Sequence, residues 1–278
     1  MILIDKENYD LLLPSLLKVE INHLFARTVL EQKMDGEVYM DDPICPSTFL
    51  VKHAYGMSLL WGNTENELFN SKLKSYLLNE NGKRQGTEWL QVFPDIWNEK
   101  LVELLGSKLV LDPIDNLALL GADKKLVAKD TRVNFRFNSK KYASCKLNLD
   151  SKFDLVKLRN GLFEKTKGSV VPARFWRNEA EFVDLGVGFS VVANGEPIST
   201  AFSAFIHDQM LELGIETLPG FQATGLASVA CSALIDYCLE NNLEPVWACR
   251  LDNVGSFKLA QKLGFEVERM IPYYQLPN

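Results

Sequence analysis

The sequence predicts a mixed α+β (mixed α/β) protein that is built from two domains. A chain of 278 residues is longer than a single hydrophobic core usually serves. Segments with helical spacing alternate with β-prone segments, and residues 115–141 are charged and irregular. We therefore place a boundary near residue 130. A smaller α/β domain is expected at 1–130 and a second domain at 131–278.

Helical spacing and capping residues predict the helices of the first domain. They are expected at residues 7–34, at 63–78, where Asn63-Thr64 supplies the cap, and from Pro94 onward. The β-prone segments predict a hairpin at 47–61 that is interrupted at Gly56, and a strand at 88–93. Residues 36–43 contain Gly36 and Asp41-Asp42-Pro43, and we expect them to form a turn.

The same patterns continue through the second domain. Strands are expected at 142–149, 187–193, 198–206, 211–218, 245–250 and 265–275. Helices are expected at 150–165, 173–183, 226–240 and 253–263. Asn194-Gly195 between two of the strands is typical of a two-residue β-hairpin turn.

Composition excludes several classes of partner. The chain is 47% hydrophobic and 24% charged, with a net charge of −6, so it has no general attraction to nucleic acid or to an anionic membrane. It contains neither a run of 18 apolar residues nor a signal-peptide pattern at its start. The five cysteines form no C-x-x-C pair and the three histidines are far apart, so no metal is expected. These features favour a cytoplasmic protein.

One strand-to-helix junction has the features of an anion site. Gln222-Ala223-Thr224-Gly225-Leu226-Ala227 precedes a long helix of small and apolar residues. The first N–H groups of a helix have no partner within the helix, and the helix dipole adds partial positive charge there. No Lys or Arg occurs between Pro197 and Ala248, so backbone groups would hold the anion, and a diphosphate is the size that fits. Neither a GxxxxGK[ST] loop nor a GxGxxG motif after an early strand is present.

A second motif lies downstream, where Asn253 and Ser256 are followed by Leu263-Gly264-Phe265. Together with Gln222, Gly225 and Ala227 it resembles the signatures of the GNAT superfamily of N-acetyltransferases. Gln222, Gly225 and Ala227 match the acyl-CoA motif Gln/Arg-x-x-Gly-x-Gly/Ala of that superfamily. Asn253 and Ser256, followed by Leu263-Gly264-Phe265, match its second signature. The resemblance covers roughly residues 140–278 and is strongest to a zwittermicin-resistance-like bacterial subgroup, whereas the N-terminal half carries no matching motif.

The resemblance implies a C-terminal GNAT fold with a splayed mixed sheet and acetyl-CoA as co-substrate. The coenzyme would lie between the strands at 211–218 and 244–250. Its pantetheine arm would pair with the backbone of Ile215, Glu216 and Thr217, and amides of Gln222, Ala223, Thr224, Gly225, Leu226 and Ala227 would hold the pyrophosphate. Asn253 and Ser256 would touch the far side of the pantetheine, although Asn253 also suits a plain helix N-cap. For Lys258 and Lys262, contact with the outer phosphate and a solvated helix face remain alternatives.

Acetyl transfer requires a base for the amine and an acid for the leaving thiolate. Glu212 and Glu216 share one face of the strand at 211–218 and are the candidate bases; solvent or a salt bridge is the alternative role for Glu212. Many members of the superfamily carry a tyrosine as the acid where this chain has Ala260. Tyr273 or Tyr274 could replace it, or could be packing residues.

The first hypothesis is therefore an acyltransferase that moves acetyl from acetyl-CoA to a primary amine of a small molecule. The N-terminal domain would cap the acceptor side, and a homodimer is a candidate assembly. The alternative is a non-catalytic acyl-CoA-binding or sensing protein, which the absent tyrosine favours. A third hypothesis is a GNAT-like scaffold that no longer binds coenzyme.

Overall fold

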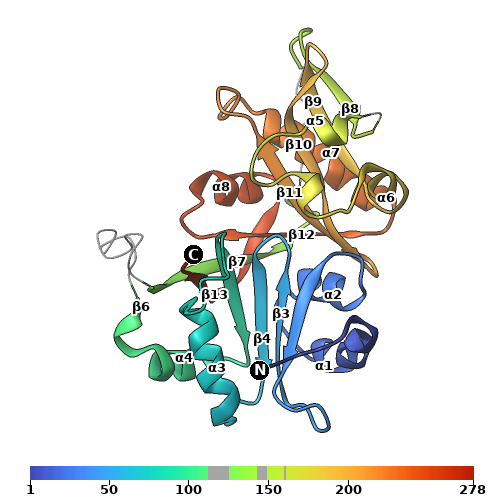
Figure 1. The fold of residues 1–278 in the computed structure, drawn as a ribbon. Coiled ribbons are helices and arrows are strands. Elements are labelled where there is room, and N and C mark those ends of the chain that lie inside the picture. The colour runs from blue at the N-terminus through green and yellow to red at the C-terminus, as the bar shows by residue number, and fades with distance from the viewer. Residues whose placement is uncertain (112–124, 143–148, 160) are drawn as a thin grey trace. The chain divides into compact units, whose positions relative to one another are not determined.

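The chain forms two compact units in the computed structural model, which describes residues 1–278 except 112–124, 143–148 and 160 (Figure 1). Unit 1 consists of Met1–Arg132, Arg250–Asp252 and Met270–Asn278. Unit 2 consists of Val133–Cys249 and Asn253–Arg269. The last residues of the chain thus belong to unit 1. A single boundary in the sequence, such as the one expected near residue 130, cannot produce this arrangement.

The sheet of unit 1 begins with four strands, each antiparallel to the next. They are β1 (Ile2–Leu3), β2 (Gly36–Met40), β3 (Thr48–His53) and β4 (Met57–Gly62). β5 (Glu88–Phe93) runs parallel to β4 without interruption from Met57↔Trp89 to Trp61↔Phe93. The C-terminal strand β13 (Phe265–Leu276) pairs with β5 at Tyr274↔Leu90, and the short β6 (Leu109–Val110) pairs with the start of β7 (Val127–Phe137).

Helices cover both faces of this sheet (Figure 1). α3 (Glu67–Leu77) and α4 (Ile96–Leu105) bury Phe69, Trp97 and Leu101 against Leu60 and Leu90 in one core cluster. The segment before β2 consists of η1 (Lys6–Leu12), α1 (Leu13–Leu16) and α2 (Leu24–Leu30), and α2 packs on β2, β3 and β4. A short turn of 3₁₀-helix, η2 (Gly106–Lys108), follows α4.

Unit 2 contains an antiparallel series of four strands followed by one parallel strand. The series is β8 (Asp154–Lys157), β9 (Gly188–Ala193), β10 (Glu196–His207) and β11 (Met210–Thr217). Asn194 and Gly195 between β9 and β10 have φ of 52° and 77°, as the predicted hairpin turn requires. β12 (Glu244–Arg250) is parallel to β11 and is followed in the strand order by β7 and β13.

The two faces of the unit 2 sheet are buried by different helices. α7 (Leu226–Glu240) and α8 (Val254–Lys262) share a core with Leu211, Leu213 and Trp247. The other face carries α5 (Leu162–Lys165), η4 (Pro172–Arg174) and α6 (Glu179–Leu185). There the ring of Phe175 contacts Phe202 and Phe205. Successive strand residues point to opposite faces, so Glu212, Gly214 and Glu216 face the α5–α6 side.

Both units repeat one order of elements. Each has a strand and short helices, then three antiparallel strands, a helix, a parallel strand, and a further helix and strand. The sequence showed no fixed-period repeat, so the shared order of elements is visible only in the structure.

Several predicted elements are present: the hairpin β3–β4, the strand β5, and every element from β9 to β13. Other predictions were wrong. Residues 36–40 form β2 and not a turn, because Val38 is buried while Glu37 is exposed and the strand pairs with β3. Residues 154–157 form β8 and not a helix, because they pair with β9.

Three expected helices also differ in extent. Residues 7–34 form three separate helices, and residues 173–183 contain η4 and the start of α6. The helix at 63–78 begins later, because Asn66 and not Asn63 accepts the capping hydrogen bond, from the N–H of Phe69. Residues 127–137 of the segment expected to be irregular form β7. The strand predicted at 142–149 lies largely outside the described residues.

Within the described residues, the helices are all too short or too polar to cross a membrane.

Candidate functional site

The two parallel strands of unit 2 separate part-way along their length. β11 and β12 pair at Met210↔Glu244, Leu211↔Pro245 and Glu212↔Val246, and no pair is found beyond that point over 213–217 and 247–250. In contrast, β4 and β5 of unit 1 stay paired for the whole of their length. Alternate residues of β11 point their N–H and C=O groups away from β10. Past Glu212 these groups are available to a ligand.

Glu212 lies at the point of separation. It is 5% exposed and is the last residue of β11 that pairs with β12. On the other side of β11, the register of β10 shifts between Ser203 and Phe205, so that Ala204 is an extra residue opposite Leu213 and Glu212. Bulges of this kind occur often beside active sites, where they re-aim side chains.

The loop after β11 is closed by its own residues. The N–H of Phe221 donates to the carbonyl of Leu218 at 3.0 Å, and the side-chain amide of Gln222 donates to the carbonyl of Thr217 at 3.2 Å. The hydroxyl of Thr224 donates to the carbonyl of Phe221. Gln222 therefore shapes the loop with its side chain.

Backbone geometry exposes the amides at the start of α7. Gly225 has φ of 88° and is the N-cap, without a capping side chain. Its carbonyl accepts from the N–H groups of Ser228 and Val229. Among the described residues, no hydrogen-bond acceptor is found for the amides from 222 to 227. This segment is half-buried to exposed except at Leu226, and its donors lack a partner within the described residues, as an anion site requires.

A cation from another helix reaches the same end of α7. The ammonium of Lys262, at the end of α8, donates to the hydroxyl of Ser228 at 3.0 Å. Sequence reasoning missed this contact because the two residues are 34 positions apart and only the packing of α8 on α7 joins them. Lys258 is exposed.

Asn253 and Ser256 are engaged in contacts within α8 and with β12. The side-chain oxygen of Asn253 accepts from the N–H of Ser256 at 3.1 Å, which is an N-cap. The hydroxyl of Ser256 accepts from the indole N–H of Trp247 at 3.1 Å. These bonds fix the start of α8 next to the separated part of β12.

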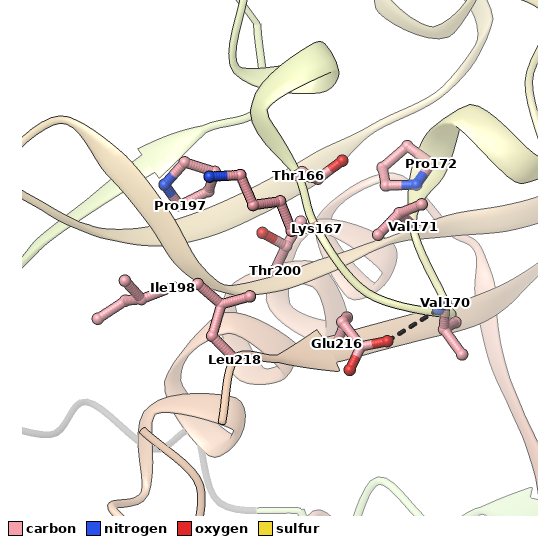
Figure 2. A pocket seen from close by; sticks show the side chains of 10 residues that line it. All are labelled: Thr166, Lys167, Val170, Val171, Pro172, Pro197, Ile198, Thr200, Glu216 and Leu218. Atoms are coloured by element: carbon pink, nitrogen blue, oxygen red, sulfur yellow. Dashed lines mark hydrogen bonds between the residues drawn. The ribbon is translucent and has the colours of Figure 1, made fainter. Parts of the chain in front are cut away.

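The three residues at the end of β11 have different environments. Ile215 packs against the α7 core, and the hydroxyl of Thr217 bonds to that of Ser199 at 2.8 Å. Glu216 points to the other face, where its carboxylate accepts from the N–H groups of Ser169 and Val170, each at 2.8 Å. Figure 2 shows the bond to Val170. The carboxylate of Glu216 is thus already hydrogen-bonded by a neighbouring loop.

Two tyrosines and two cysteines with reactive groups are also buried. Ala260 is fully buried. Tyr274 belongs to unit 1, where its hydroxyl donates to Asn98 at 2.8 Å, and Tyr273 stacks on Trp89 of the same unit. Burial raises the pKa of the Cys238 thiol to about 12 and also raises the pKa of Cys231, so neither suits a nucleophile. No cluster of metal-binding side chains occurs in the described part of the chain.

Comparison with known proteins decides the family. The profile of the GNAT acetyltransferase family matches residues 15–274. The chain belongs to the GNAT acetyltransferase family. An uncharacterised N-acetyltransferase of Bacillus subtilis (strain 168), YdfB, is 25% identical over 244 residues, which cover 87% of this chain and 86% of that protein.

Solved structures share the fold of this GNAT protein. A GCN5-related N-acetyltransferase-like protein from Streptococcus suis matches with a TM-score of 0.70 and 21% identity, covering 98% of this chain and 100% of that one. A tandem GNAT protein from the clavulanic acid biosynthesis pathway matches with a TM-score of 0.59 and 7% identity, covering 99% and 97%. The family match extends far beyond residues 140–278, because it includes most of unit 1.

Proposed function

We propose that this GNAT protein transfers acetyl from acetyl-CoA to a primary amine of a small molecule, and that the coenzyme lies between β11 and β12 of unit 2. The observation that carries the proposal is the loss of pairing after Glu212↔Val246. It leaves backbone groups of Ile215, Glu216 and Thr217 available to the amide-containing pantetheine arm.

Two sources of positive charge would hold the phosphates of the coenzyme. The amides from 222 to 227 at the start of α7 have no acceptor within the described residues, and the ammonium of Lys262 lies beside Ser228 in the first turn. Hydrogen bonds to a charged acceptor contribute about 1.5–3 kcal/mol each, so several together suffice for micromolar binding.

Direct attack within a ternary complex is the proposed route. The amine nitrogen forms a bond to the acetyl carbon, the carbon–sulfur bond breaks, and coenzyme A leaves as its thiolate, which takes a proton from solvent water. Glu212 accepts the proton of the amine, directly or through water. An N–H group of residues 215–217 donates to the oxyanion. No side chain is assigned as the acid, because the methyl side chain of Ala260 has no ionisable proton and Tyr273 and Tyr274 are packed in unit 1.

The two units would have different roles. Unit 1 repeats the order of elements of unit 2, but its β4–β5 pair stays closed. We therefore propose one coenzyme per chain, bound by unit 2.

The zwittermicin-resistance-like subgroup, a homodimer and a cytoplasmic location remain proposals. The net charge of −6 favours a cationic amine, and the free cysteines Cys45, Cys231, Cys238 and Cys249 favour a reducing compartment.

A non-catalytic acyl-CoA-binding protein is the second candidate, and the apolar Ala260 favours it. Calorimetry with acetyl-CoA, followed by thiol release across a panel of amines, separates the two. We expect one binding site and turnover with at least one amine. Tight binding without turnover across the panel would support the second candidate, and absence of binding would contradict both.

A further inference from the structure

The loop between α5 and η4 crosses the end of β11 in unit 2. We call residues 166–172 the strap. Its ends are anchored: the hydroxyl of Thr166 donates to the carbonyl of Phe163 at 2.7 Å, and Val171 and Pro172 are buried. Its middle, residues 167–169, is exposed. Figure 2 shows the strap passing over the strands that carry Thr200 and Glu216.

The side chain of Glu216 accepts hydrogen bonds from the middle of the strap. Its Oε2 accepts from the N–H of Ser169 at 2.8 Å, the hydroxyl of Ser169 at 3.2 Å and the N–H of Val170 at 2.8 Å. Within the described part of the chain, no other acceptor is found for these two N–H groups. Charge-assisted bonds of this kind are about twice as strong as neutral ones, so one carboxylate oxygen anchors the strap.

Gly168 permits this close approach. It has φ of 135°, and a Cβ built there would lie 2.4 Å from Cδ of Glu216. Any other residue would therefore strain the backbone and push the strap away from the carboxylate. The cavity between the strap, β10 and β11 is about 10 Å³, room for one water molecule. The strap thus lies directly on the strands.

We propose that Glu216 is a positioning residue, and not the base, which holds the strap against the end of β11 as a wall of the acceptor site. The assignment to the acceptor rests on the proposed function, because residues 215–217 are where the thioester would lie. A carboxylate oxygen that already accepts three hydrogen bonds is poorly suited to accept a proton as well.

Three variants separate positioning from proton transfer. Glu216→Asp keeps the charge but is too short to reach the strap. Gly168→Ala leaves the carboxylate intact but displaces the strap. Glu216→Gln keeps the length of the side chain and one oxygen that can accept hydrogen bonds from the strap, but it loses the negative charge. Gly195→Ala is the matched control, because it has φ of 77° and no atom within 4 Å of the added Cβ.

Hydrogen exchange of the amides of residues 169–170 tests the anchor without any need for activity. Exchange is expected to be about tenfold faster or more in Glu216→Asp and in Gly168→Ala, and unchanged in Gly195→Ala. Thermal unfolding of each variant establishes that it is folded. Unchanged exchange in both Glu216→Asp and Gly168→Ala would overturn the proposal.

Steady-state kinetics then test the effect on the acceptor. Both variants should raise KM for the amine about tenfold, with KM for acetyl-CoA within about twofold of the wild type, and Glu216→Gln should keep most of kcat. A loss of kcat of about 100-fold in Glu216→Gln, with normal kinetics in Gly168→Ala, would instead identify Glu216 as the base. If the wild-type chain acetylates no amine, the proposed function fails, and the exchange experiment still decides the anchor.

Discussion

Glu212 occupies the point at which β11 loses its pairing with β12, and it is buried there opposite the bulge of β10. We expect Glu212→Gln to lower kcat about 100-fold, since general base catalysis contributes roughly 10²–10⁴-fold. KM for acetyl-CoA should change little, because in the proposed site backbone groups bind the coenzyme. Glu244→Gln, an exposed residue at the paired end of β12, is the control in the same thiol-release assay. Normal rates in Glu212→Gln from pH 6 to 9 would remove it as the base.

Gly225 has a left-handed backbone conformation and lies within the proposed anion site at the start of α7. Gly225→Glu should weaken acetyl-CoA binding by more than about 100-fold, because it places a carboxylate where several amides would bind phosphate. Gly195→Glu is the control for backbone strain, because Gly195 has a similar φ in the β9–β10 turn of the same unit. We expect its affinity for acetyl-CoA to be unchanged. Calorimetry gives both affinities. Equal affinities in the two variants would contradict the proposed coenzyme site.

At the scale of elements, one carboxylate organises the connection from β2 to β3. Oδ1 of Asp41 accepts from the N–H groups of Ser47 at 2.8 Å and Thr48 at 3.1 Å, and Oδ2 accepts from Asn66, the cap of α3. Partial burial by itself would raise the pKa of Asp41, but these hydrogen bonds outweigh it and hold the pKa below the ordinary 3.8.

Because the folded-state pKa of Asp41 is lowered, its stabilisation is complete above the unfolded-state value and is lost as pH falls through the folded one. Asp41→Asn should therefore lower the unfolding free energy by about 1–2 kcal/mol at pH 7, and by less and less below pH 3.8. Urea unfolding at pH 7, 4 and 3 measures the difference. A difference that stays constant across these pH values would show that Asp41 does not act through its charge.

At the scale of the whole molecule, the C-terminal residues of the chain support the N-terminal unit. Tyr274 and Leu276 are buried in the core of unit 1, and the guanidinium of Arg84 donates to the carbonyl of Pro277 at 3.0 Å. Arg84 also pairs with Glu88 at 2.9 Å, and both side chains are almost fully buried. The last nine residues thus contribute side chains to the hydrophobic core of unit 1 and a carbonyl group to its buried Arg84–Glu88 ion pair.

Deletion of residues 270–278 should therefore destabilise unit 1 by more than about 5 kcal/mol, since losing two large core side chains costs about 2–5 kcal/mol each. Hydrogen exchange should accelerate in β3, β4 and β5 more than in β9 and β10. Leu276→Ala should give a smaller effect in the same strands, and Val267→Ala, at an exposed position of β13 in unit 2, should give almost none. Equal acceleration in both units would contradict this assignment.

The sequence predicted the elements of unit 2 best where local signals agreed. Asn194-Gly195 marks a hairpin by its backbone preference alone, and the helix after Gly225 is marked by its glycine and its apolar face. Prediction failed at β2 and β8, where short strands with exposed charged residues depend on pairing with β3 and β9. Pairing between distant segments leaves little trace in local sequence.

The sequence by itself determined the family resemblance, the loop predicted to bind an anion and the two glutamates of β11, because each is a property of residues close together in the chain. Only the tertiary structure decided that β11 and β12 separate at Glu212, that Lys262 reaches the start of α7, and that Glu216 bonds the strap. It also decided that the end of the chain completes unit 1. All of these depend on contacts between residues far apart in sequence, which packing creates and no local pattern encodes.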